Sequence, residues 1–495
     1  MKTTTKIFVL LIFFVLGLIG IWHHEIWLDE AHHFLLGRDS TSFFDLFYNA
    51  RYEGHPLLWN ALLLILTFFT KNIFAMQLLH LLIASANIFL ILWYAPFPKH
   101  QKLLLTFSYF IFYEYSIISR NYAVSLFFLL ITVILYCKES KNYVLIFLCL
   151  SLLANTHLFS FFFSIFFFIY VLANNKERRL IFAQPKYIAS MSFFIFAIIF
   201  SAIQIKVPSD HFLFNFDSDK LLSYKRIGKT FSICWKGLFH FPDATLYNCW
   251  NTNWLVNYSK KMAGGASLIA WLVPFFILKD NRKTVLLFYA SALAVAFFIY
   301  VSPIIVAVRH CGFLFLLLLT CYWIKHSKYK DNTNGLQYSS LLFSIILFPS
   351  CIASVVMYVH DYQFAFSTGR RATIFIESNN GVFNFPVIAQ NTSVPVYSAY
   401  SGKKAIDVNT LKPTNFCNWN DYPFMITPDD FVLHAKKYLI DNTRGSAILL
   451  CQDSLNTEKN YDLVKIKLLQ RFDDAIVKTE CYKIYRMDII NTKQQ

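Results

Sequence analysis

Residues 23–39 read HHEIWLDEAHHFLLGRD and directly follow an apolar run, residues 6–22, that is long enough to cross a bilayer. A spanning helix therefore carries four histidines and four acidic residues to a membrane surface. The rest of the chain repeats this alternation of apolar runs and polar connections. With 56% hydrophobic and only 15% charged residues, it is far more apolar than one water-soluble core requires. The sequence predicts an all-α polytopic membrane protein.

The apolar runs predict about 11 to 13 transmembrane helices. The basic start at residues 1–22 has no small-residue cleavage site behind it, so we expect a retained first helix and not a removed signal peptide. A further apolar run, residues 56–70, is expected to make no net crossing, because otherwise the basic connections do not alternate sides. The expected spans are 6–22, 73–95, 102–118, 121–137, 143–158, 159–174, 188–206, 264–278, 284–302, 309–325 and 338–357.

Basic residues cluster in every second connection, which the positive-inside rule assigns to the cytoplasm together with the N-terminus. The net charge of +16 is explained by these clusters, so we expect no nucleic-acid partner. The His-rich stretch, the connections SRNY and NTHLFS, the 207–263 loop and SPIIVAVRH then share the opposite side. The clusters contain Lys2, Lys6, Lys99, Lys102, Lys138, Lys141, Lys176, Arg178, Arg179, Lys186, Lys279, Arg282, Lys283, Lys325, Lys328 and Lys330.

Hydropathy falls from about residue 358 onward. We expect residues 1–357 to form the membrane domain, with a catalytic first extracytoplasmic loop at 23–56, and residues 358–495 to form a small soluble α/β domain on the extracytoplasmic side. Short strands are predicted in FPVIAQ, VPVYSAY, SAILLCQD and ECYKIYRM, with a helix near 428–440.

The acidic pair Asp29 and Glu30 is the first candidate for chemistry. Adjacent helical residues point about 100° apart, so the two carboxylates do not face each other, but either is suited to act as a general base. The simpler alternative is that they mark the water boundary. His32 and His33 follow Asp29 at the i+3 and i+4 positions, so one helical face could also present a divalent metal site. We predict no obligatory metal or cofactor.

Two arginines near span ends are the second set of candidates. An arginine at the lipid boundary costs free energy unless it is paired or reaches water, which makes Arg120 and Arg309 candidates for binding a lipid phosphate. Their alternative role is that of lipid anchors. His55 lies between Gly54 and Pro56 at a helix start, and Tyr122 and His157 lie on the same predicted side of the membrane.

The order of these motifs resembles one known group of proteins. W-x-D-E follows the first helix, H-P opens a later helix, and S-R-x-Y-A-x-x-L, T-H-x-F-S and R-H follow in turn. Over residues 1–357 the chain resembles the GT-C superfamily of integral-membrane glycosyltransferases, and is most similar to its protein O-mannosyltransferase and aminoarabinose-transferase branch. Many relatives have H-P-P where this chain has H-P-L.

The resemblance implies that a sugar is transferred from a polyprenyl-phosphate carrier to an extracytoplasmic protein, lipid or glycan acceptor, usually with inversion. It implies Asp29 as the catalytic acid of the first loop, with Glu30 beside it, and a location in the plasma (inner) membrane. The departing phosphate needs cationic groups to stabilise its charge, and Arg120 and Arg309 could supply them. We expect His55, His157 and Tyr122 at the same donor site. Three alternatives remain: a transporter or flippase for a lipid-linked glycan, a surface-glycan polymerase or ligase, and a membrane metallohydrolase.

Overall fold

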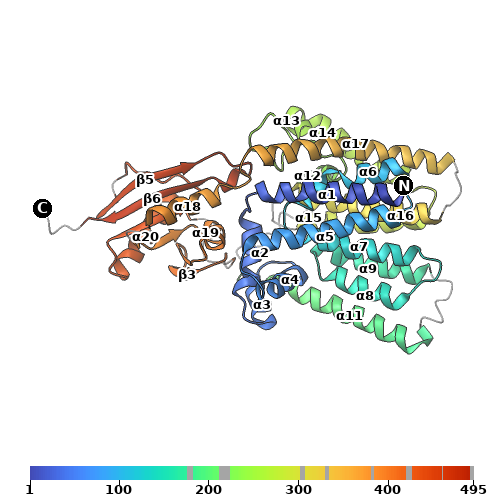
Figure 1. Cartoon of the computed structure of the whole chain (residues 1–495), viewed down its shortest axis with the longest axis horizontal. Coiled ribbons are helices and arrows are strands. Elements are labelled where there is room, and N and C mark those ends of the chain that lie inside the picture. The colour runs from blue at the N-terminus through green and yellow to red at the C-terminus, as the bar shows by residue number, and fades with distance from the viewer. Residues whose placement is uncertain are drawn as a thin grey trace.

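The chain consists of a helical part and a smaller α/β part that follow one another along its long axis (Figure 1). The computed structural model describes residues 1–174, 182–210, 223–301, 307–328, 334–380, 384–417, 419, 426–459 and 461–490. Several predictions therefore fall wholly or partly outside the described residues: the basic residues Lys176, Arg178, Arg179 and Lys330, part of the predicted 207–263 loop, and the start of SPIIVAVRH.

Among the described residues, seven helices are long and apolar enough to cross a membrane. Each coincides with a predicted span, so a multi-pass membrane protein is confirmed. They are α1 (Thr3–His23), α5 (Ile73–Tyr94), α11 (Pro185–Ile205), α14 (Lys260–Leu278), α15 (Arg282–Val301), α16 (Val308–Lys328) and α17 (Asn334–Gln363). Shorter apolar helices occupy three more predicted spans: α7 (Tyr122–Cys137), α8 (Tyr143–Ala154) and α9 (Leu158–Ala173).

The predicted span 102–118 is wrong, because the chain does not form one helix there. Helix α6 (Lys99–Thr106) ends, and a π-helical turn, η1 (Tyr109–Glu114), follows it. All side chains of η1 are buried, so the backbone groups released at the break bind protein groups and do not face lipid. The backbone N–H of Tyr109, for example, donates to the Ser350 hydroxyl at 3.0 Å.

The apolar run 56–70 forms only a ten-residue helix, α4 (Leu58–Thr67). A helix of that length is about 15 Å long, half of the roughly 30 Å of hydrocarbon in a bilayer, so α4 does not cross alone. It packs against α2 (Leu28–Asp39), with α3 (Phe43–Asn49) beside it. Figure 1 shows these three helices at the end of the helical part nearest the α/β part, with the N-terminus at the other end.

The predicted 207–263 loop is not a simple loop where it is described. It contains α12 (Tyr224–Cys234), a 3₁₀ turn, η3 (Trp235–Gly237), and α13 (Trp254–Tyr258). The turn η3 packs against α16 so closely that a Cβ atom on Gly237 would overlap the carbonyl of Cys311. This segment is therefore packed into the helical part. Its mixture of polar and apolar residues did not indicate this packing.

The α/β part is built on a six-stranded sheet in the described residues, with the order β3-β2-β1-β4-β6-β5. The pairs β1–β2 and β1–β4 are parallel, and the other three pairs are antiparallel. The strands are β1 (Val387–Ala389), β2 (Ala405–Asp407), β3 (Lys412–Thr414), β4 (Ser446–Cys451), β5 (Val464–Phe472) and β6 (Tyr482–Ile489).

Helices cover both faces of this sheet. In β4, Ile448 and Leu450 pack toward α18 (Gly369–Asn380) and α19 (Val394–Ser401), whereas Ala447 and Leu449 pack toward α20 (Pro428–Asp441). This alternation is the two-residue period of a strand. The expected small α/β domain is thereby confirmed, including the helix near 428–440.

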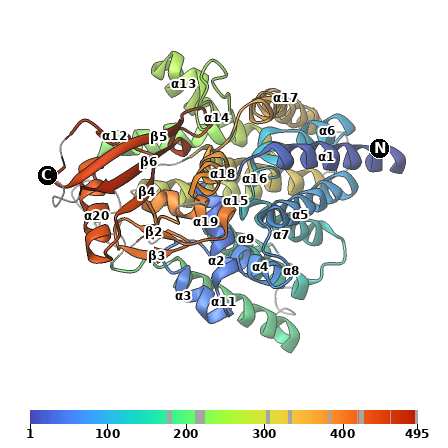
Figure 2. The same ribbon diagram turned by 60° about the vertical axis from the view of Figure 1, so that its left-hand side comes forward.

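One predicted strand is wrong: VPVYSAY forms the helix α19. Pro395 lies in its first turn, where the missing N–H of proline costs nothing. Its apolar residues are buried because α19 packs between the sheet and α2, and a helix buried in this way has no clear period (Figure 2). Through the contact between α19 and α2, the α/β part packs against the first loop.

Candidate active site

Three residues that are distant in sequence meet at Asp29. Asp29 lies in the first turn of α2, Arg120 lies two residues before α7, and Arg309 lies in the first turn of α16. The Asp29 Oδ2 atom is 2.5 Å from Arg120 Nη1 and 3.0 Å from Arg309 Nη2. The Asp29 side chain keeps 21% of its surface exposed, so it stays partly accessible despite the two ion pairs.

The two arginines control the charge of Asp29. Burial opposes ionisation of this carboxyl group, but the guanidinium groups of Arg120 and Arg309 outweigh it and hold the pKa of Asp29 below its ordinary value. Asp29 is therefore a carboxylate at neutral pH. Its environment is strongly cationic, because two guanidinium groups face one carboxylate.

Each arginine is held by its own surroundings. The guanidinium carbon of Arg309 lies 4.9 Å from the ring centre of Trp27 and 5.5 Å from that of Trp250, a cation–π arrangement. The backbone carbonyl of Arg120 lies 2.9 Å from a ring nitrogen of His80. Within the described residues, the buried Nε atoms of both arginines lack a hydrogen-bond partner. Each guanidinium thus has an N–H left to donate to another anion.

Three predicted rings form a stack beside this centre. The ring centres of His55 and His157 are 5.1 Å apart, and those of His157 and Tyr122 are 4.7 Å apart. His157 caps α9 by accepting the backbone N–H of Phe159 at its Nδ1 atom, which leaves Nε2 buried and without a partner in the described structure. Burial, followed by the charge of Arg120, lowers the pKa of His55 to about 4, so His55 is neutral at pH 7.

Glu30 has a different set of partners from Asp29. It is fully buried, accepts the backbone N–H of Ser119 at 2.6 Å, and lies 3.0 Å from His24 Nε2. The other nitrogen of His24 is 2.7 Å from an oxygen of Asp361. Burial opposes protonation of His24, but Asp361 and Glu30 together raise its pKa to about 10. A protonated His24 therefore bridges two carboxylates.

This geometry makes Glu30 a link between elements. It fastens the first turn of α2 to Ser119, the residue before Arg120, and so sets the distance between Asp29 and Arg120. Glu30 is therefore placed to position α2, and its partners differ from those of Asp29.

Glu53 is the acidic residue that sequence reasoning missed. Its Oε1 atom lies 2.6 Å from His32 Nε2 and accepts the indole N–H of Trp419 at 3.1 Å, while Oε2 lies 3.7 Å from His33 Nε2. Burial opposes its ionisation, yet His32 and the neighbouring imidazoles hold the pKa of Glu53 far below its ordinary value. The signal was present in RYEGHP, two residues before His55.

The histidines after Asp29 thus lie against Glu53. The second nitrogen of His33 is 2.7 Å from Asn60 Oδ1, and the second nitrogen of His32 lies 3.3 Å from the backbone nitrogen of Cys417. In the described ranges, no group of three or more His, Cys, Asp or Glu side chains has an arrangement that would hold a metal ion.

The centre therefore combines a partly accessible carboxylate, two guanidinium groups with spare donors, and a stack of largely neutral rings. All of these lie where membrane helices end and the first loop begins. Such a set can bind a phosphate through the guanidinium groups and accept a proton at the carboxylate. Six of the seven predicted site residues belong to it, and Glu30 supports it from behind.

No family model matches the chain, and no curated protein matches its sequence. Among solved structures, the chain is similar to the crystal structure of ArnT from Cupriavidus metallidurans bound to undecaprenyl phosphate. That similarity has 10% sequence identity and a TM-score of 0.49, and covers 98% of each chain.

Proposed function

We propose that this chain is a membrane glycosyltransferase that moves one sugar from a polyprenyl-phosphate carrier to an acceptor outside the cytoplasm. The observation that carries the proposal is the convergence of Asp29, Arg120 and Arg309 at one end of the membrane helices. The motif order of the sequence, with its resemblance to GT-C enzymes, points to the same chemistry. The chain would act in the plasma (inner) membrane.

The arginines suit the phosphate of the carrier. A guanidinium group offers paired N–H donors that match phosphate oxygens, and it stays charged at any relevant pH. Arg120 and Arg309 approach one point from two sides, and each retains a buried Nε–H without a partner in the described structure. They would hold the donor phosphate and stabilise the charge that it gains on leaving.

An apolar groove suits the hydrocarbon chain of the carrier. A cavity of about 190 Å³ lies between α4, α8 and α11 and is lined mostly by apolar side chains such as Leu57, Phe196 and Phe200. Leu57 follows His55 by two residues, and its backbone N–H donates to Gln204 Oε1 at 2.7 Å. Two of its lining residues, Leu57 and Asn155, lie two residues from His55 and His157, so a lipid attached to a phosphate at these rings could enter this groove.

Asp29 would supply the base. As the acceptor oxygen attacks the anomeric carbon, the bond from that carbon to the phosphate oxygen breaks. Asp29 takes the acceptor's proton, and the carrier leaves as polyprenyl phosphate. The donor phosphate would compete with Asp29 for Arg120 and Arg309. Weakening the two ion pairs raises the pKa of Asp29 toward its ordinary value, which makes the carboxylate a stronger base when donor is bound.

The arginines already provide cationic stabilisation, so this scheme requires no divalent ion. The rings of His55, His157 and Tyr122 would form a wall of the donor site. Neutral imidazoles beside two arginines add no further positive charge and leave the phosphate as the preferred partner of the guanidinium groups. A panel of donors with different sugars tests which sugar the site accepts.

The test is to incubate the purified protein with a panel of polyprenyl-phosphate sugars and a membrane extract as the source of acceptor, and to measure release of the free carrier phosphate. Asp29→Asn keeps the size and hydrogen bonding of the side chain but removes its charge and basicity. We expect it to lower turnover by about 10² to 10⁴ without weakening donor binding, because the donor phosphate no longer competes with a charged Asp29. Asp45→Asn, in the same loop but bonded to Thr41, is the control and should keep wild-type turnover.

Full turnover in Asp29→Asn, at wild-type expression, would contradict the proposed base. Movement of an intact lipid-linked sugar across vesicles, with no carrier released by any donor, would instead identify a flippase. Both results come from the same preparation, so the two function classes are separated directly.

A further inference from the structure

A second cavity, of about 800 Å³, lies at the junction of the helical and α/β parts. It is lined by the end of α1, the start of α5, the end of α2, and residues of α18 and α19. Besides His24, which is paired with Glu30 and Asp361, four of its side chains are cationic and one is acidic: Arg38, Lys71, Arg370 and Lys404 against Asp39. The cavity does not contain Asp29, Arg120 or Arg309, so it is distinct from the candidate active site.

The single acidic residue is already neutralised. Asp39 accepts two hydrogen bonds from Arg38, at 2.8 and 3.0 Å, and one from the side-chain amide of Asn415 at 2.7 Å. In contrast, Lys71, Arg370 and Lys404 are exposed, and none of them forms a salt bridge within the described part of the chain. The cavity thus has an excess of three positive charges.

Outside the cavity lining, Arg370 also influences the acidic residue Glu25. Burial raises the pKa of Glu25 to about 7, against the opposing effect of Arg371 and Arg370, so this carboxyl group is only partly charged at neutral pH. His24 and Gln77 also line the cavity, and Gln77 donates to the backbone oxygens of Ile21 and His24. Neither residue cancels the positive charge.

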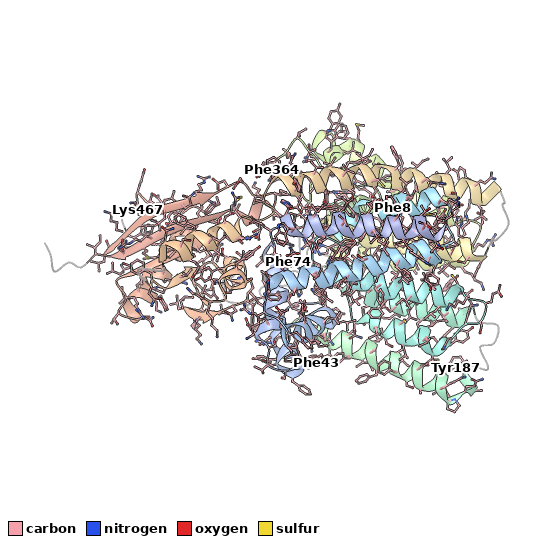
Figure 3. The ribbon with its side chains drawn as sticks, viewed as in Figure 1. Phe8, Phe43, Phe74, Tyr187, Phe364 and Lys467 are labelled. Carbon is pink, nitrogen blue, oxygen red and sulfur yellow. The ribbon has the colours of Figure 1, made fainter. Side chains whose placement is uncertain are left out.

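Another part of the cavity rim is apolar and lies where α1 ends and α5 begins. It contains Ile21 and Trp22 from α1 and Ile73 and Phe74 from α5. Trp22 is 70% exposed, and its ring meets that of Phe74 edge to face at 5.6 Å. Figure 3 places Phe74 at the end of the helical part that faces the α/β part, and Phe8 farther along α1.

The residues below that rim are those of a lipid-facing surface. Along α1, Phe8, Leu11, Val15 and Ile19 are exposed, as expected for side chains that contact hydrocarbon. An exposed tryptophan at the end of such a helix is typical of the headgroup level of a bilayer. The lining of the cavity therefore combines cationic side chains with apolar side chains from the end of a lipid-facing helix.

We propose that this cavity binds the phosphate headgroup of an anionic membrane lipid, with the acyl chains lying against α1 and α5. Lys71 belongs to the helical part, whereas Arg370 and Lys404 belong to the α/β part. One lipid phosphate between them would fasten the two parts together at the membrane surface. The proposal depends on the position of the cavity at the membrane and not on glycosyl transfer.

The experiment measures bound lipid by native mass spectrometry of the full-length protein, titrated with phosphatidylglycerol or with phosphatidylcholine of the same acyl chains. The test variant is Lys71→Gln/Arg370→Gln/Lys404→Gln. The control is Lys437→Gln/Lys465→Gln/Lys467→Gln, which removes the same charge from exposed lysines elsewhere on the α/β part. All six residues are exposed, so we expect both variants to fold, which a thermal melt verifies.

We expect wild type and control to prefer phosphatidylglycerol and the test variant to bind it on the order of 10-fold to 100-fold more weakly. Phosphatidylcholine binding should be equal in all three proteins. Equal loss in the control, or full retention in the test variant, would overturn the proposal. Displacement of phosphatidylglycerol by inorganic phosphate at similar concentration would also overturn it, because it would show a site for soluble anions without a contribution from the acyl chains.

Discussion

At the scale of single residues, Arg120 and Arg309 each use one nitrogen to hold Asp29 and retain further donors. This geometry explains why arginine, and not lysine, stands at both positions. An ammonium group is a point charge that cannot contact a carboxylate and a phosphate through separate, fixed N–H bonds. The chemistry of the centre therefore depends on the shape of these side chains as well as on their charge.

Arg120→Lys and Arg309→Lys should each weaken donor binding by about tenfold, because the two-pronged contact with phosphate is lost while the charge remains. The measurement is the affinity for a polyprenyl-phosphate sugar that the wild-type protein accepts. Arg444→Lys, an exposed position in the α/β part, is the control and should bind donor like wild type. If both site variants keep wild-type affinity, the two arginines are structural partners of Asp29 alone.

The raised pKa of His24 predicts how the stability of the protein depends on pH. Its pKa rises from an ordinary value of 6.5 to about 10 in the folded protein, so folding favours the protonated form. The resulting stability is fully present below about pH 6.5 and is lost as the pH rises through about 10. We expect the thermal midpoint of the purified protein to fall over that range, and to fall less steeply in His24→Gln.

Glu30→Gln removes the charge from one of the two carboxylates that hold His24, so it should share part of that flattening. Its turnover should fall less than that of Asp29→Asn, as expected for a residue that positions α2.

A steep pH dependence of the thermal midpoint in His24→Gln, equal to that of wild type, would show that another group causes the loss of stability at high pH.

At the scale of elements, the break between α6 and η1 brings aromatic side chains against α16. The hydroxyl of Tyr115 donates to the backbone carbonyl of Arg309 at 2.6 Å, and Phe110 packs on the same helix near Gly312. A straight helix over 102–118 would direct these rings elsewhere. The irregular segment therefore supports the position of Arg309.

Gly312→Ala tests this support. A Cβ atom at Gly312 would overlap the ring of Phe110 and the hydroxyl of Tyr115, so either the rings or the start of α16 must move. We expect a loss of about 1 to 3 kcal/mol in stability together with reduced turnover. Gly445→Ala, where a Cβ atom would meet nothing within 4 Å, is the control for both measurements. A Gly312→Ala protein with wild-type stability and turnover would show that η1 does not set the geometry of the site.

At the scale of the whole molecule, the first loop is held between the helical and α/β parts. Glu480 accepts the backbone N–H of Leu28 at 3.4 Å, Tyr400 accepts that of Ile26 at 3.1 Å, and Trp419 donates to Glu53. The α/β part thus contacts both ends of the loop that carries Asp29. Its role at the site is structural, because these hydrogen bonds hold the loop in place.

The same arrangement predicts membrane topology. The N-terminus lies at one end of the helical part, and the first loop and the α/β part lie at the other (Figure 1). If the N-terminus is cytoplasmic, as the basic clusters indicate, reporters fused after residue 30 and after residue 400 should both give an extracytoplasmic signal. A reporter at the N-terminus serves as the opposite control. A cytoplasmic signal from either of the first two fusions would contradict the orientation.

The sequence alone determined the membrane helices, the small α/β domain and most of the residues of the candidate site. It could do so because a bilayer requires long apolar helices. Charged residues at the ends of these helices cost free energy unless they are paired or reach water. Asp29, Arg120 and Arg309 were therefore visible as exceptions in an apolar chain.

Only the tertiary structure decided which of these residues meet. It separated Asp29 from Glu30, brought Glu53 to His32, broke the predicted span 102–118, and turned the predicted strand VPVYSAY into a helix. Each outcome depends on contacts between segments that are distant in the chain. Hydropathy and periodicity indicate which face of a single segment contacts water, lipid or protein. Packing against other segments decides which side chains form ion pairs, where a helix breaks, and whether a buried segment is a helix or a strand.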